Sequence, residues 1–397
     1  MEKKRKSGAL KMPYLYDRYI HFATLILVFF GLVMITSASM GLAAGNTIYL
    51  VSVVAKQIVF SVVGYVAMLL VAKAFTFQRL RNSISLIVLG TVGALLFALM
   101  FGSVGGAKAW IRIPMPGGEV TIQPSEFAKI SIMLVVAVYL CDLKQKASTN
   151  WELVKTPAII IAIFAFIVGF LQSDFGSMIV MLAIAVIIFL IPQHPQLVKY
   201  QKVVFILIVL GIVGVVFLIS PIGVNFVEHL PLAIYQKNRI LSAVNPFADK
   251  YGSGYQLVNG LVSFASGGFF GVGFGNSVRK YTNFPAANTD FILAIVVEEL
   301  GFLGFLIIFT CYALIMFRLF KYAFKMKSEK GRVILIGTAM YILVHFIFNV
   351  GGVTGLIPLT GVPLLMISYG GSSTMSIMVA IGISQAVISR YRTGEIE

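Results

Sequence analysis

The hydrophobic positions of this 397-residue chain gather into long runs that are separated by polar connections. A helix needs about 20 apolar residues to cross the hydrocarbon core of a bilayer, and these runs approach that length. To within a few residues at each end, the runs are 19–39, 50–72, 83–102, 125–141, 157–172, 176–191, 203–220, 290–317, 332–351 and 373–389. The pattern predicts an all-α polytopic membrane protein with about ten transmembrane helices.

The composition agrees with a membrane protein, and the chain is expected to consist of one membrane domain with a short polar tail at each end. The chain is 59% hydrophobic and 12% charged, whereas soluble domains are about 25% charged. Residues 1–18 form a basic tail that we expect to be disordered, 19–389 form a single membrane domain, and 390–397 form a short C-terminal tail. The first run is long enough to span, and no small-residue cleavage site follows it, which favours a retained helix over a signal peptide.

The basic residues set the predicted orientation. With the N-terminus in the cytoplasm, 22 of the 31 Lys and Arg lie on cytoplasmic segments and 8 lie outside, while Lys129 falls within a span. This asymmetry follows the positive-inside rule, so we expect both termini in the cytoplasm and the large connection 221–289, between helices 7 and 8, on the outer face. The net charge of +16 is then a signal of topology and lipid headgroups, and nucleic acid is not expected as a partner.

One apolar stretch inside the outer connection could be mistaken for another span. If Tyr255–Phe274 crossed the membrane, every later segment would change sides, and the basic connection Arg318–Arg332 would face outward. Several glycines also make this stretch a poor free-standing helix. We therefore predict a helix that lies at the outer interface or dips into it. The two cysteines, Cys141 and Cys311, indicate neither a disulfide nor a metal site.

The candidate chemistry centres on the Gly-rich stretch 245–301. It contains Arg279 and Lys280 and a single carboxylate, Asp290, where the eighth apolar run begins. Asp290 could simply cap that helix, which would itself justify an aspartate. Our prediction is that this loop holds the active site, with Asp290 at its centre.

Ionisable residues within spans are costly, about 2.5–3.5 kcal/mol each on insertion scales, so each needs a reason. Glu126 and Lys129 are three residues apart at the start of the fourth run, where they share a helix face and can pair, and Ser125 is the predicted N-cap. A structural ion pair and a role at the mouth of a cavity are equally open. Upstream, Trp110 is expected in the interfacial aromatic belt, and Arg112 could bind a phosphate.

Other polar positions have two interpretations each. Lys56 is either a snorkelling lysine or a phosphate contact. Asp174 lies in a tight turn, where turn chemistry or capping of the sixth helix is preferred over a supporting role at the site. Ser372 and Ser373 begin the last helix and could form an anion site, or the turn could be re-entrant without a ligand.

Two adjacent carboxylates, Glu298 and Glu299, are predicted roughly 12–14 Å beyond Asp290 along one continuous helix. Carboxylates at that depth need a polar partner or cavity. His345 and Asn349, four residues apart on the ninth run, are the predicted partners.

Read in order, these motifs resemble the SEDS family (shape, elongation, division and sporulation) along nearly the whole chain. The segments that carry the resemblance are Tyr16-Asp17-Arg18, Met34-Ile35-Thr36-Ser37-Ala38-Ser39, Gln123-Pro124-Ser125-Glu126-Phe127-Ala128-Lys129, Asp174-Phe175-Gly176, Gly252-Ser253-Gly254-Tyr255-Gln256, Gly275-Asn276-Ser277, Thr289-Asp290-Phe291 with Glu298-Glu299, and Ile367-Ser368-Tyr369-Gly370-Gly371-Ser372-Ser373. The first two are more similar to the division branch of the family than to the elongation branch.

The resemblance implies a ten-helix peptidoglycan glycosyltransferase of the bacterial cell membrane, acting at the division septum. It would join lipid II into β-1,4 glycan strands with inversion and release undecaprenyl pyrophosphate. The essential aspartate of the family corresponds to Asp290. Its further site residues correspond to Glu126, Lys129, Trp110, Arg112 and Lys56.

The loop departs from the family pattern before this aspartate. Many relatives read Pro-Glu-Ala-His-Thr-Asp, where this chain has Ala286 and Asn288 in place of the Glu and the His. A mechanism with that histidine as base is therefore not expected here, and more of the proposed chemistry falls on Asp290. We predict that Asp290 accepts the proton of the acceptor 4-hydroxyl, while Arg112, Lys129, Lys56 and Arg279 stabilise the pyrophosphate, with or without a divalent metal.

Two other functions stay open. A lipid II flippase would also use charges at membrane depth and broken helices, but no repeat pair is visible. A scaffold for division proteins would need no catalytic carboxylate. The resemblance also implies a single-pass class B penicillin-binding transpeptidase as a partner, together with other division proteins.

Overall fold

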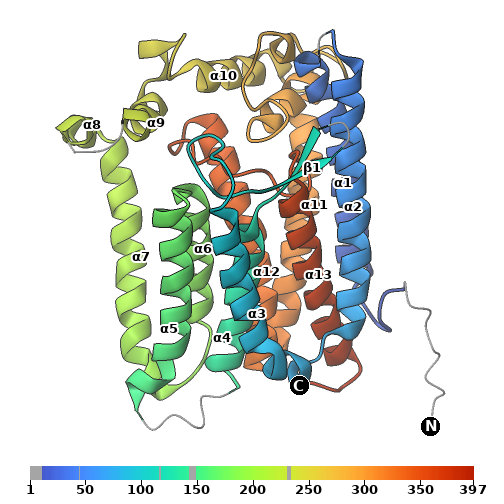
Figure 1. The fold of residues 1–397 in the computed structure, drawn as a ribbon, viewed down its shortest axis with the longest axis vertical. Helices are drawn as coiled ribbons and strands as arrows, with labels where there is room; N and C mark the ends of the chain where they lie inside the picture. The colour runs from blue at the N-terminus through green and yellow to red at the C-terminus, as the bar shows by residue number, and fades with distance from the viewer. Residues whose placement is uncertain (1–10, 44, 116–117, 143–148, 230–233) are drawn as a thin grey trace.

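The computed structural model describes residues 11–43, 45–115, 118–142, 149–229 and 234–397. A bundle of long, roughly parallel helices forms the body of the molecule, and shorter helices lie across one end of it (Figure 1). The C-terminus lies at the other end (Figure 1).

Each of the ten predicted runs corresponds to a helix. These are α1 Arg18–Leu42, α2 Thr47–Ala74, α3 Phe77–Ala98, α4 Pro124–Tyr139, α5 Asn150–Phe166 with the π-helical turn Ile167–Leu171, α6 Phe175–Phe189, α7 Val198–Ile219, α11 Ile292–Lys325, α12 Glu329–Thr354 and α13 Gly371–Arg392. Among the described residues, eight of these are long and apolar enough to cross a membrane, whereas α4 and α6 have 16 and 15 residues. The polytopic class is thus confirmed, and the count of ten crossings stays a prediction.

The large connection between α7 and α11 is more helical than the sequence suggests. It contains α8 Pro221–His229, α9 Ile234–Val244, the 3-10 turn Pro246–Asp249, α10 Tyr255–Gly267 and the 3-10 turn Arg279–Tyr281. In Figure 1, α10 runs across the end of the bundle rather than along it, which agrees with the prediction of an interfacial helix.

Two features were not predicted. Strands β1 Ile111–Met115 and β2 Gly118–Ile122 form an antiparallel hairpin before α4, with Arg112 opposite Thr121. The expected cytoplasmic connection 318–332 is mostly helical, since α11 continues to Lys325 and α12 begins at Glu329.

The end that carries the C-terminus is held together by the buried carboxylate of Asp17, the N-cap of α1. Its Oδ2 accepts hydrogen bonds from Arg318 and from the Tyr322 hydroxyl, both on α11. Gln385 of α13 bonds to both the backbone N–H and the carbonyl of Asp17, at 2.8 and 2.9 Å. The Tyr-Asp-Arg segment therefore joins α1, α11 and α13, far from the interfacial helices.

Candidate active site

A cavity of about 660 Å³ opens between α4, the α12–α13 connection and the segment that precedes α11. Arg239 and Ile240 of α9 also line it, which places it at the end of the bundle that the short helices cover. Eight predicted site residues line this cavity: Trp110, Glu126, Lys129, Asp174, Asp290, His345, Ser372 and Ser373. Six separate parts of the chain thus bring these side chains to one place.

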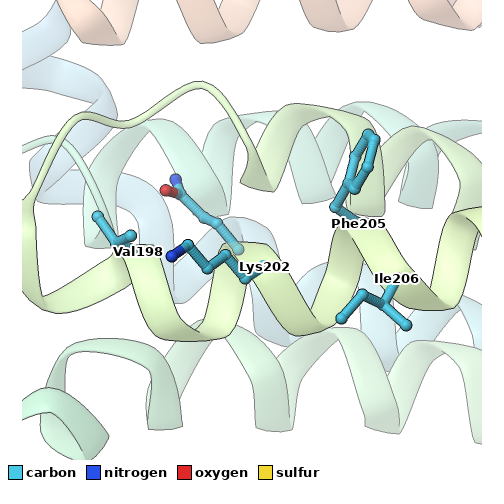
Figure 2. Close-up of a pocket in the computed structure, with 5 residues that line it drawn as sticks. Val198, Lys202, Phe205 and Ile206 are labelled. Atoms are coloured by element: carbon cyan, nitrogen blue, oxygen red, sulfur yellow. The ribbon is translucent and has the colours of Figure 1, made fainter.

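A second pocket lacks the charged groups of this cavity that could act as a base. The shallow groove along the start of α7 is lined by Val198, Gln201, Lys202, Phe205 and Ile206, and it contains no carboxylate (Figure 2). Proton transfer from a sugar hydroxyl needs a base, so the cavity that contains Asp290 is the candidate active site.

Asp290 is half-buried and does not cap α11, whose N-cap is Phe291 without a side-chain hydrogen bond. The capping interpretation is therefore wrong. Burial raises the pKa of Asp290 to about 6, while the nearby positive charge of Arg239 acts in the opposite direction. Such a carboxylate is ionised at neutral pH and is still basic enough to accept a proton.

The backbone around Asp290 is held on three successive carbonyls. Those of Asn288, Thr289 and Asp290 accept hydrogen bonds from Tyr369 N–H, Ser368 Oγ and Asn349 Nδ2, at 2.8, 2.7 and 2.8 Å. The turn also requires Ala286 at φ 56°, a left-handed conformation that costs a residue with a Cβ about 1–2 kcal/mol. Because the packing overcomes that cost, Asp290 occupies a fixed position.

In the same cavity, Lys129 and Glu126 of α4 form the predicted ion pair at 2.7 Å, and both side chains are almost fully buried. Glu126 also accepts a hydrogen bond of 2.6 Å from the Tyr341 hydroxyl, and Lys129 lies 2.9 Å from His345 Nε2. Tyr341 and His345, one turn apart on α12, therefore hold the pair from the opposite side.

The residues at the rim combine capping with site formation. Asp174 caps α6 by accepting from Ser177 N–H, as predicted, and its other oxygen accepts from Gln123 Nε2. Gln123 is the N-cap residue of α4, so the predicted cap, Ser125, is wrong; its hydroxyl has no hydrogen-bond partner among the described residues. Ser372 Oγ accepts from Gln123 N–H and links α13 to α4.

Five predicted residues are not part of the cavity wall. Lys56 of α2 donates to the Glu119 carbonyl, and Arg112 of β1 lies 3.8 Å from the Glu119 carboxylate, so both contact the hairpin beside the cavity. Arg279, Glu298 and Glu299 lie in a separate polar cluster.

That cluster explains why two carboxylates occur deep in an apolar helix. α11 is interrupted at Gly301 (φ 67°), and residues 272 and 273 donate to the freed carbonyls of Glu298 and Glu299. Irregular backbone at membrane depth is tolerated where it is buried in protein. The continuous helix that we predicted is therefore wrong at this point.

The predicted partners of these carboxylates are also wrong. Glu299 pairs with Lys280 at 2.8 Å and accepts from Ser37, while Glu298 accepts from Ser263 and Ser277. His345 and Asn349 instead belong to the cavity side of the molecule, where they bond to Lys129 and to the Asp290 carbonyl. The carboxylates hold segment 275–281 against α1 and α11.

Three residues of the site were missed by sequence reasoning. Arg239, Tyr341 and Gln123 approach Asp290, Glu126 and Asp174 respectively. The sequence signal for Arg239 was its place among the eight basic residues predicted on the outer side of the membrane. Nothing local distinguishes Tyr341 from other tyrosines in apolar helices.

A family model described as a cell cycle protein, FtsW/RodA/SpoVE, matches residues 17–393. The chain belongs to this family. The FtsW/RodA/SpoVE family is the one that the motifs indicated, so the predicted resemblance is confirmed.

Curated relatives cover almost the full length of both chains. Stage V sporulation protein E of Bacillus subtilis is 31% identical over 94% of this chain and 97% of its own. A protein of the same organism named probable peptidoglycan glycosyltransferase FtsW is 33% identical over 94% of this chain and 90% of its own. A protein of that name from Dichelobacter nodosus is 31% identical over 93% and 89%. The names of the last two relatives agree with the predicted enzyme class and with the division branch.

Solved structures confirm the fold. A structure described as a peptidoglycan synthase complex that coordinates polymerization and crosslinking gives a TM-score of 0.71, with 24% identity over 96% of this chain and 98% of the other. The rod shape determining protein RodA of Thermus thermophilus gives a TM-score of 0.61, with 22% identity over 95% and 98%.

Proposed function

We propose that this family member polymerises lipid II into β-1,4 glycan strands at the outer face of the cell membrane, for septal wall synthesis. The observation that carries the proposal is that a half-buried carboxylate of raised pKa, Asp290, and a buried ammonium, Lys129, line one cavity. A base and a cation are the two groups that this glycosyl transfer needs.

The reaction follows from these two groups. The Asp290 carboxylate takes the proton of the acceptor 4-hydroxyl as that oxygen bonds to the anomeric carbon of the donor sugar. The bond from this carbon to the diphosphate oxygen breaks, with inversion, and its electron pair leaves with undecaprenyl pyrophosphate. Lys129 and Arg239, which both line the cavity, stabilise the growing negative charge. This role does not extend to Arg112, Lys56 and Arg279, because they lie outside the cavity wall.

A metal remains a separate question for experiment. No group of three or more His, Cys, Asp or Glu side chains that could hold a metal ion occurs in the part of the chain that the structure describes. Polymerisation in the presence and absence of a chelator tests a metal requirement directly.

The decisive experiment is polymerisation of purified lipid II by wild type and by Asp290→Asn, which keeps the size of the side chain and removes the base. Loss of a general base lowers rates about 10²–10⁴-fold. Wild-type rates should also fall as pH drops through about 6, because protonation inactivates the base. Near-normal polymer from Asp290→Asn would refute the assignment, and labelled lipid II that crosses vesicles without polymer would favour a flippase.

The outer location of the cavity is part of the proposal. Tyr251, in the connection before α10, and Phe324, in the last turn of α11, are both strongly exposed and lie toward opposite ends of the bundle. Single-cysteine replacements should react with an impermeant reagent from outside at position 251 and not at position 324. The reverse result would place Asp290 in the cytoplasm. We also propose a class B penicillin-binding transpeptidase as a partner, which co-purification tests.

A further inference from the structure

Two polar residues of α12 form hydrogen bonds to two successive residues of the cavity wall. His345 and Asn349 are four residues apart, so they lie on one helix face, and both are buried. His345 Nδ1 lies 3.1 Å from the carbonyl of Pro363, and Asn349 Nδ2 donates to the carbonyl of Val362 at 2.9 Å. The α12–α13 connection is thus attached to α12 through two successive carbonyls.

The same two residues reach both sides of the proposed reaction. The second N–H of the Asn349 amide donates to the backbone carbonyl of Asp290 at 2.8 Å. The other ring nitrogen of His345, Nε2, lies 2.9 Å from Lys129 Nζ. One face of α12 therefore contacts the backbone of the base and the side chain of the cation.

The partners of His345 determine which of its nitrogens carries hydrogen. A carbonyl oxygen only accepts, so Nδ1 must carry the hydrogen that is donated to Pro363. An ammonium only donates, so Nε2 must present its lone pair to Lys129. His345 is accordingly neutral, and its ring is held between one acceptor and one donor.

Lys129 has three N–H donors, and two of them are used. One is directed to Glu126 at 2.7 Å and one to His345 at 2.9 Å, while the ammonium lies 5.4 Å from the centre of the Tyr341 ring. No other hydrogen-bond acceptor contacts Lys129 Nζ within the described ranges, and Lys129 lines the cavity. The remaining N–H is left for a ligand.

We propose that His345 is a positioning residue, which orients the Lys129 ammonium so that its remaining N–H meets the diphosphate of the lipid-linked donor. The inference rests on the proposed function and adds a residue to it. His345 itself touches neither sugar nor phosphate. Its contribution is to fix where Lys129 points, relative to the wall that Asn349 joins to Asp290.

The test compares four single variants, one of them Lys129→Met, and the double variant of Lys129→Met with His345→Leu, each measured per folded molecule in detergent. His345→Leu is similar in volume and removes both hydrogen bonds. His345→Gln retains one acceptor for Lys129 and one N–H donor for Pro363. Thr338→Val is the matched control, because Thr338 is a buried polar residue of α12 that bonds to Ser384 and Ile334 away from the cavity.

If His345 acts by orienting Lys129, His345→Leu should lower kcat about 10- to 100-fold with little change in KM, as expected for a misplaced group that acts in the transition state. His345→Gln should recover most of the rate, and Thr338→Val should match wild type. Combined with Lys129→Met, His345→Leu should add no further loss, because the group it orients is already absent.

Two results would overturn the inference. One is a His345→Leu variant of lowered thermal stability but unchanged kcat per folded molecule, and the other is a double variant whose losses multiply. Binding of undecaprenyl pyrophosphate is measured in parallel and is expected to weaken in His345→Leu and persist in His345→Gln. If wild type binds this lipid but forms no polymer, the proposed function fails, and equal binding by the two His345 variants would then refute the inference as well.

Discussion

Two buried lysine–glutamate pairs in the part of the chain that the structure describes look alike by distance and burial. Lys129 and Glu126 are 2.7 Å apart with side chains 1% and 2% exposed, and Lys280 and Glu299 are 2.8 Å apart with both side chains 0% exposed. Burial and pairing alone therefore cannot say which pair performs chemistry.

The pairs differ in how completely the lysine is used. Lys280 donates to Glu299, to Ser37 and to the Gly275 carbonyl, which accounts for all three of its N–H groups. Lys129 uses two, and it lines a cavity where Lys280 does not. A buried cation with every donor satisfied holds the fold together, whereas one with a donor left at a cavity can bind a substrate.

The largest effect should come from breaking the closed pair. Lys280→Met leaves Glu299 buried without its counter-ion, and loss of one partner of such a pair costs about 3–5 kcal/mol. We expect a marked fall in the free energy of unfolding, measured by denaturation in detergent. Adding Glu299→Gln should recover part of it because no uncompensated charge remains; equal stability of wild type and Lys280→Met would contradict this view.

Lys129→Met should act on rate instead. Removing one group that stabilises developing negative charge lowers kcat about 10²–10³-fold. Stability should fall less than in Lys280→Met, since Glu126 keeps the Tyr341 hydroxyl and borders a cavity. Single-turnover polymerisation and thermal unfolding, measured on the same preparations, separate the two effects.

A smaller effect is expected from Tyr341→Phe, which removes the hydroxyl that donates to Glu126. A hydrogen bond to a charged group contributes about 1.5–3 kcal/mol, and only part of it should reach the rate. Tyr322→Phe is the matched control, because the Tyr322 hydroxyl donates to Asp17 at the far end of the bundle. A slower Tyr322→Phe enzyme, per folded molecule, would argue against a local role for Tyr341.

The smallest effect is a shift of the pH profile, which is measured separately from the loss of rate expected when Arg239 no longer stabilises the leaving diphosphate. Arg239 lowers the pKa of Asp290 against the raising effect of burial, so Arg239→Gln should raise that pKa further above about 6. Less of the carboxylate is then ionised at a given pH, and the acid limb of the rate profile should move to higher pH. Arg279→Gln, outside the cavity wall, should leave the limb in place.

Much of the fold could be predicted because apolar length is a strong signal. Each predicted run corresponds to a helix, but the interruption of α11 at Gly301 was not predicted, since the break depends on residues 268–273, which approach α11 from another segment of the chain. The hairpin of β1 and β2 was not predicted for a different reason. Its apolar alternation is short and is followed directly by a helix.

The ionisable residues of the site could be predicted from the sequence, but most of the partners of these residues could not. Asp290, Glu126 and Lys129 stood out because charges are costly near apolar spans. Glu298 and Glu299 stood out for the same reason, yet they belong to the closed cluster. Which carboxylate meets which cation depends on tertiary packing, and the sequence contains no short-range signal that pairs Glu299 with Lys280 rather than with His345.

The most direct test of the account is polymerisation of lipid II per folded molecule by Lys129→Met and Lys280→Met side by side. We predict that Lys129→Met stays folded and loses nearly all activity, while the folded fraction of Lys280→Met polymerises at the wild-type rate. Wild-type activity in folded Lys129→Met, or inactivity of folded Lys280→Met, would contradict the assignment of the cavity as the catalytic centre.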